Sequence, residues 1–171
     1  LLEVLDTEKA VQNIAGLRPP YLGLSAHIGN WEVGAAGIAR LAGSAHAIAR
    51  VTKNPLLHRW LSRNRERGGL IVHPRRGGVR GLVAALAAGH VGLQVVDQNQ
   101  RLRGVFVPFF GRIASCERAG VTLALRRGYP ILIGVALRVG NGFRFELVLE
   151  PPFHLESTGD READLYNAVL R

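Results

Sequence analysis

The feature that most constrains the fold is an alternation of short β-rich runs with helical patterns. Six runs have the length and composition of strands, at 21–26, 45–51, 70–73, 91–96, 131–139 and 143–150. Helical patterns lie between most of them, at 31–41, 55–67, 79–88 and 116–127. This order predicts an α/β fold with a largely parallel central sheet flanked by helices.

Local signals sharpen several of these boundaries. Asn54 is a good N-cap, Pro55 suits the first helical turn, and Gly68 suits the end of the same helix. The Gly-rich segment 140–142 predicts an antiparallel hairpin between the last two strands. A final amphipathic helix is expected after Asp160.

The length of 171 residues predicts one domain over 1–171. The single cysteine, Cys116, excludes a disulfide framework and fits a reducing compartment. The six histidines show no metal-binding spacing, so we expect no metal. Because the sequence lacks Met, even at position 1, we expect it to be a fragment.

Hydropathy excludes a transmembrane helix within these residues. The longest stretch without Asp, Glu, Lys or Arg is Gly81–Val96, which is 16 residues and contains several polar or glycine positions. A spanning helix needs about 20 mostly apolar residues. If the full protein has a membrane anchor, we therefore expect it to lie outside this sequence.

Positive charge is concentrated in one segment. The net charge is +9, and the segment 50–80 holds nine basic residues against Glu66 alone. Such a single-sign segment is expected to attract polyanions such as anionic lipid, an acidic protein or nucleic acid. The nine residues, here called the basic patch, are Arg50, Lys53, Arg59, Arg63, Arg65, Arg67, Arg75, Arg76 and Arg80.

The segment 25–32 carries the clearest chemical signal. A strand is expected to end just before His27, Gly29 permits a tight turn, and Asn30 can cap the next helix. His27 should therefore lie at the carboxyl edge of the sheet, where open α/β folds bind ligands. Glu32 falls in the first helical turn, and we expect its carboxylate to return to the imidazole. A histidine oriented by a carboxylate is a general base.

These residues resemble a known family. The segment 27–32 (HIGNWE) resembles the H-x4-E block of the bacterial lipid A biosynthesis acyltransferases, of the glycerolipid (lysophospholipid) acyltransferase superfamily. Residues 54–57 (NPLL) are similar to the family's NPLL segment, and 97–98 followed by 107–111 are similar to its DQ…VPFFG block. The resemblance spans roughly 21–153. It implies a glycerolipid-acyltransferase-like fold and a fragment without the family's N-terminal membrane helix and C-terminal segment.

The resemblance implies transfer of a fatty acyl group from a thioester to a lipid hydroxyl. The donor would be acyl carrier protein or acyl-CoA, and the acceptor a lipid A precursor or related lipid. No cofactor and no nucleic acid are implied. The expected location is the cytoplasmic face of the bacterial inner membrane, with the basic patch against the membrane surface.

The resemblance also implies roles for individual residues. His27 would be the general base and Glu32 the carboxylate that orients it. Backbone amides near Gly29 or Gly111 are candidate oxyanion donors. The remaining substrate-binding candidates are Asn30, Arg50 for an acceptor phosphate, Asp97 and Gln98 for sugar or glycerol hydroxyls, and Phe109 and Phe110 for the acyl chain. Plain core packing is the alternative for the two phenylalanines.

Other interpretations remain open at this point. The acceptor could be a phosphatidylinositol mannoside or another lysolipid. A serine hydrolase is a remote alternative, with Ser25 near a nucleophile-elbow pattern and Asp97 and His154 in the matching chain order. A basic nucleic-acid-binding module is suggested by a pI of about 11.1, but no C-x2-C or RNP pattern is present.

Overall fold

The computed structural model describes residues 5–6, 12, 14 and 16–171 of the chain. The strands in this part are β1 (Leu5–Asp6), β2 (Leu22–Ser25), β3 (Ala45–Ala49), β4 (Leu70–Pro74), β5 (Val91–Val95), β6 (Val105–Phe109), β7 (Arg112–Cys116), β8 (Ile131–Arg138) and β9 (Phe145–Leu149). The helices are α2 (Trp31–Leu41), α3 (Pro55–Arg67), α4 (Gly78–Ala87), α5 (Ala119–Arg127) and α6 (Arg161–Leu170).

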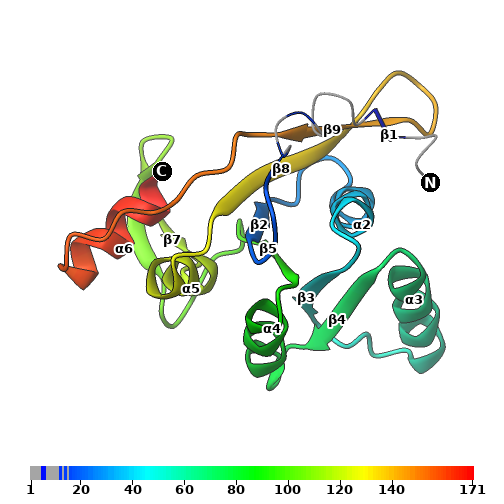
Figure 1. The fold of residues 1–171 in the computed structure, drawn as a ribbon, viewed down its shortest axis with the longest axis horizontal. Helices are drawn as coiled ribbons and strands as arrows, with labels where there is room; N and C mark the ends of the chain where they lie inside the picture. Colours follow the sequence, from blue (N-terminus) through cyan, green and yellow to red (C-terminus); the bar gives the residue numbers. More distant parts are fainter. Residues whose placement is uncertain (1–4, 7–11, 13, 15) are drawn as a thin grey trace.

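Seven of these strands form one sheet, in the order β1-β9-β8-β2-β5-β3-β4 (Figure 1). The pairs β2–β5, β2–β8, β3–β4 and β3–β5 are parallel, as is the short β1–β9 pair. Among the described strands of this sheet, β8 and β9 are the pair that runs antiparallel, as the hairpin signal predicted. The predicted α/β fold with a largely parallel sheet is confirmed.

Helices cover both faces of the sheet and create two cores. On one face, α2 contributes Val33, Ile38 and Ala39 to a cluster with β3, β4, β8 and β9. On the other face, α4, α5 and α6 pack around Leu22 of β2 and Ile131 of β8. The central position of β2 between β5 and β8 fixes where the segment after it leaves the sheet.

One predicted helix begins later than expected. The pattern at 116–127 predicts a helix, but the helix α5 begins at Ala119. Residues 112–116 instead form β7, which pairs antiparallel with β6 in a separate two-stranded sheet. The Glu117 carboxylate accepts hydrogen bonds from the backbone N–H groups of Arg118 and Ala119 and so starts the helix there.

Some strands are shorter than the sequence patterns predict. The strand predicted at 45–51 ends at Ala49, so residues 50–54 form a loop before α3. The strand predicted at 143–150 begins at Phe145. In both cases the residues that the prediction wrongly included, 50–51 and 143–144, are exposed.

The C-terminal helix α6 is tied to the loop before it by Asp164. The buried carboxylate of Asp164 accepts hydrogen bonds from the Thr158 hydroxyl (2.7 Å), the Thr158 backbone N–H (2.8 Å) and the Ser157 hydroxyl (2.7 Å). These bonds, led by the one from the Thr158 side chain, lower the pKa of Asp164 to about 2. The ionised form is therefore the one that stabilises the fold.

Replacing Asp164 with asparagine should change the acid stability of the protein. The folded pKa of about 2 lies below the ordinary value of 3.8, so the stabilisation is full above about pH 4 and is lost as the pH falls toward 2. D164N should have a lower Tm than the parent at pH 7 and a flatter dependence of Tm on pH between 5 and 2. Ser157→Ala, which removes one donor, should be intermediate. Parallel profiles for the parent and D164N would contradict this role.

Candidate active site

The segment after β2 is held against β8 by a glycine. Gly29 has φ +63° and forms a bridge with Ala136 of β8. A side chain at this position would overlap the Ala136 carbonyl oxygen. That oxygen accepts a hydrogen bond from the Asn30 backbone N–H at 2.8 Å. The turn therefore requires glycine, and the Asn30 amide is already engaged within the fold.

The helix α2 then begins as the sequence predicts. The Asn30 side-chain oxygen accepts a hydrogen bond from the Val33 backbone N–H at 3.2 Å, so Asn30 is the N-cap. Glu32 lies in the first helical turn. The turn thus places His27 beyond the carboxyl end of β2 and Glu32 at the start of α2.

The partner of His27 is Asp97, which follows β5. Asp97 accepts a hydrogen bond from the His27 backbone N–H at 2.8 Å through one oxygen. Its other oxygen lies 2.7 Å from Nδ1 of the His27 imidazole. One carboxylate therefore holds both the main chain and the ring of the histidine. Because β2 and β5 are parallel neighbours, their carboxyl ends meet at this edge of the sheet.

The charge state of Asp97 determines the tautomer of His27. Partial burial raises the pKa of Asp97, but the hydrogen bonds from the His27 ring and backbone outweigh it, so the pKa lies below 3.8. An ionised carboxylate only accepts, so Nδ1 carries the proton and Nε2 keeps its lone pair. The side chains of His27 and Asp97 are 41% and 37% exposed, which leaves the ring accessible to a substrate.

The expected pairing of Glu32 with His27 is not what the structure shows. The Glu32 carboxylate is bound by the guanidinium of Arg65 in α3, with Nε donating to one oxygen at 3.0 Å and Nη2 donating to the other. The Arg65 side chain is only 15% exposed, whereas the other basic-patch residues are exposed. A bidentate guanidinium matches a carboxylate better than one imidazole nitrogen does. The correction is therefore that Asp97, not Glu32, contacts the imidazole.

Glu32 and Arg65 still belong to the surroundings of His27. The Trp31 ring packs edge-on against the His27 ring, with centroids 5.9 Å apart. The Trp31 ring also contacts Arg65, whose guanidinium carbon lies 5.8 Å from the centroid of the Trp31 ring. The ion pair thus joins α3 to α2, and Trp31 contacts both its Arg65 and the His27 ring.

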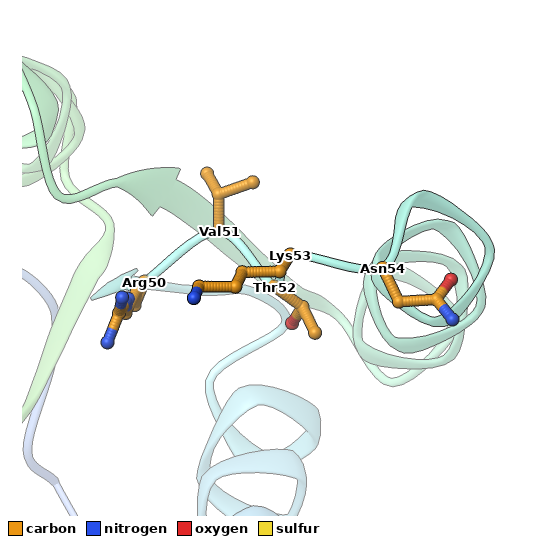
Figure 2. A pocket seen from close by; sticks show the side chains of 5 residues that line it. All are labelled: Arg50, Val51, Thr52, Lys53 and Asn54. Carbon is orange, nitrogen blue, oxygen red and sulfur yellow. The ribbon is translucent and has the colours of Figure 1, made fainter.

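A pocket of about 570 Å³ lies after β3, along residues 50–54. Figure 2 shows the Lys53 side chain extending along this loop in the direction of Arg50. In the sheet β3 is next to β5, which is next to β2, so this loop follows the same carboxyl edge as His27 and Asp97. Two strand spacings of about 4.8 Å separate β2 from β3, roughly 10 Å. Arg50 and Lys53 therefore place positive charge along the same edge of the sheet as the His27–Asp97 pair.

The other predicted substrate-binding residues lie on exposed segments. Gln98 is exposed directly after Asp97. Phe109 ends β6, and Phe110 and Gly111 form the turn of the β6–β7 hairpin. Both phenylalanines are exposed, so the alternative that they are ordinary core residues is wrong.

The residues of the hydrolase alternative are not brought together. Asp97 is bound to His27, while His154 Nδ1 lies 3.2 Å from the Gly128 carbonyl oxygen. The helix after β2 begins at Trp31, six positions beyond Ser25, rather than directly after it. Ser25 thus lacks both the sharp strand-to-helix turn and the histidine that a nucleophile elbow needs.

A second group of histidines lies apart from this site. His46 is buried, its Nδ1 lies 3.0 Å from His73 Nε2, and its ring is also close to that of His90. Burial, and then the proximity of the two other rings, lower the pKa of His46, which favours its neutral form. Among the described residues no group of three or more His, Cys, Asp or Glu side chains is arranged to hold a metal ion.

The fold and the site together define the class of the protein. The α/β domain holds a histidine paired with a carboxylate at the edge where parallel sheets bind ligands. The family model for bacterial lipid A biosynthesis acyltransferases matches residues 19–168. The chain belongs to this family and is an acyltransferase of the lipid A type. No curated protein matches the chain.

Within the part of the chain that the structure describes, every helix is too short or too polar to cross a bilayer.

Proposed function

We propose that the protein transfers a fatty acyl group from a thioester to a hydroxyl group of a lipid A precursor or a related lipid. The single observation that carries the mechanism is the double contact of Asp97 with the backbone and ring of His27. The family match supports the reaction class. Acyl carrier protein or acyl-CoA supplies the thioester.

In the proposed mechanism, Nε2 of His27 removes the proton of the acceptor hydroxyl as its oxygen attacks the thioester carbonyl. Asp97 stabilises the imidazolium through Nδ1–H and keeps the ring in one orientation. Collapse of the tetrahedral intermediate breaks the carbon–sulfur bond, and the imidazolium returns the proton to the leaving thiolate. The products are an ester and a free thiol, and no covalent enzyme intermediate forms.

The loop after β3 is suited to a phosphorylated acceptor. Arg50 and Lys53 are exposed and line the pocket beside the catalytic edge. A guanidinium and an ammonium can neutralise a phosphate of a glycolipid headgroup. Gln98, next to Asp97, would bind a sugar hydroxyl of the same headgroup. A phosphatidylinositol mannoside or another lysolipid has the same combination of phosphate and hydroxyl groups.

A transfer assay tests the proposal directly. The purified chain is incubated with acyl-CoA or acyl carrier protein thioester and a phosphorylated glycolipid acceptor, and the esterified lipid is measured by mass spectrometry. We expect transfer that requires both substrates, with free thiol released in equal amount to ester. Thiol release without ester in the presence of every acceptor would identify a thioesterase and refute the proposal.

The basic patch is proposed to hold the protein on the anionic cytoplasmic face of the inner membrane. Arg63 and Arg67 of α3 are exposed, and neither takes part in the pairs around His27. The double variant R63E/R67E should bind anionic vesicles more weakly, because each basic residue near the surface contributes about 1 kcal/mol. The deficit should shrink in high salt.

The matched control is Arg126→Glu in α5, a charge reversal outside the basic patch. Vesicle binding is measured by sedimentation across a salt series. Turnover at saturating soluble substrate should change little in both variants, since the chemistry lies at His27. Equal vesicle binding by R63E/R67E and the parent at low salt would show that the patch is only a solvated surface.

A further inference from the structure

The β6–β7 hairpin carries an apolar surface that is exposed in the part of the chain that the structure describes. Val107 of β6 is buried, and β6 packs against α6 on this side. Side chains alternate along a strand, so Phe106 and Pro108, with Ile113 opposite Pro108 on β7, face the other way. One face of the hairpin is thus anchored, and the other is open to solvent.

The open face and the tip expose large side chains to an unusual degree. Phe106 is 67%, Phe109 62%, Phe110 92% and Ile113 69% exposed. A single exposed apolar residue is common, but a contiguous exposed group marks a binding surface. Four such residues within one short hairpin form a group of this kind.

The turn places an aromatic residue where the backbone disfavours it. Phe110 and Gly111 connect the last pair of the ladder, and both have positive φ values, +47° and +75°. Two-residue turns of this type favour Asn or Gly, and a bulky residue at positive φ is strained. The Phe110 ring contacts the Phe109 ring edge-on, with centroids 4.7 Å apart. Because the Phe110 side chain is exposed, burial within the described chain does not offset this strain. We therefore expect Phe110 to contact something outside the described chain.

The hairpin and the loop before it carry only positive charge. Arg101, Arg103 and Arg112 are exposed, and no Asp or Glu occurs from Gln98 to Cys116. Aromatic side chains flanked by arginines match the boundary between the headgroups and acyl chains of an anionic bilayer. Acidic groups alone would satisfy the arginines but not the protruding rings.

We propose that the tip of the β6–β7 hairpin inserts into the headgroup region of an anionic lipid bilayer. Phe109 and Phe110 enter the apolar boundary, while the three arginines contact lipid phosphates. This contact is separate from the part of the basic patch that lies on α3, because α3 and the hairpin lie at opposite ends of the molecule (Figure 1). It does not depend on the acyl-transfer mechanism.

The test is sedimentation of the full chain with vesicles of phosphatidylcholine, with and without phosphatidylglycerol. The double variant F109S/F110S should bind the anionic vesicles at least about tenfold more weakly, because burying one such ring contributes a comparable or larger factor. The matched control is Phe143→Ser, since Phe143 is also exposed but lies in the β8–β9 turn. It should bind within about twofold of the parent. Circular dichroism melting confirms that each variant is folded.

A depth measurement makes the result specific to the tip. Phe110→Trp should show an emission shift to shorter wavelength and quenching by brominated lipid beyond the signal of Trp31 and Trp60, whereas Phe143→Trp should not. Parent-like binding by F109S/F110S would overturn the proposal. The proposal would also be wrong if F109S/F110S bound vesicles normally but lost self-association, because the tip would then be a dimer contact. If the variant bound vesicles normally but lost acyl-thioester binding, the tip would be part of the substrate site. The vesicle assay contains no thioester, so failure of the proposed function would not affect it.

Discussion

Replacing His27 with alanine is expected to lower the rate of acyl transfer by ~10²–10⁴-fold, the usual contribution of a positioned general base. The substitution removes the nitrogen that accepts the hydroxyl proton. It also removes the ring hydrogen bond to Asp97, but the backbone hydrogen bond from residue 27 to Asp97 does not need the ring and should persist. The fold should therefore survive.

The measurement is kcat and KM for acyl transfer by the parent and H27A, with Tm determined on the same preparations. The histidine side chain is partly exposed, so we expect only a small change in Tm. The matched control is His154→Ala. His154 is also exposed, and its ring lies against the Gly128 carbonyl oxygen rather than against a carboxylate. A folded H27A with near-parent kcat would refute the assignment of His27 as the base.

The sequence was sufficient to predict the turn that carries the histidine. Gly29 and Asn30 are local signals, and the structure uses both as expected, one for a positive φ and one for an N-cap. The alternation of strands and helices likewise predicted the sheet, because each helix must cross between parallel strands. These features depend on neighbours within a few residues.

The partner of His27 could not be predicted in the same way. Asp97 is 70 positions away from His27. Its contact depends on β5 pairing with β2 and not with β4, the strand that precedes β5 in the chain. Glu32 is close in sequence and was the natural expectation, but its carboxylate is taken by Arg65 from α3. One signal was available: Asp97 directly follows a predicted strand, as His27 does, and such residues meet at one edge of a parallel sheet.

The β6–β7 hairpin was missed for a related reason. Its strands are short, and the Phe110–Gly111 turn lacks the Asn-Gly or Asp-Gly pattern that signals a two-residue loop. Residues 112–115 were assigned to no element, and Cys116 was placed at the start of the following helix, although Glu117 is where that helix receives its first side-chain hydrogen bonds. Unusual turn chemistry thus hid the element that exposes Phe109 and Phe110.

Replacing Asp97 with asparagine should cost nearly as much activity as removing His27. An asparagine retains the shape of the side chain but carries no charge to stabilise the imidazolium, and its NH₂ group can favour the wrong tautomer. In the Ser-His-Asp triad the corresponding change lowers kcat ~10⁴-fold. Since Asp97 is more exposed than that buried carboxylate, we expect a loss of ~10²–10³-fold in kcat with KM little changed. Asp97→Glu should recover part of the rate.

The comparison that separates the two carboxylates is D97N against E32Q, assayed side by side for kcat, KM and Tm. Glu32 contacts Arg65 and not the imidazole, so E32Q weakens a partly exposed ion pair, worth about 0–1 kcal/mol, and should leave kcat within about tenfold of the parent. Arg65→Gln removes the other member of the same pair and should resemble E32Q. If E32Q instead lost as much kcat as D97N while remaining folded, Glu32 would have to reach His27 during the reaction. The ion pair with Arg65 would then describe only the resting arrangement of the site. If D97N kept a parent-like kcat, the contact between Asp97 and His27 would be structural, and the proposed His27–Asp97 base would be wrong.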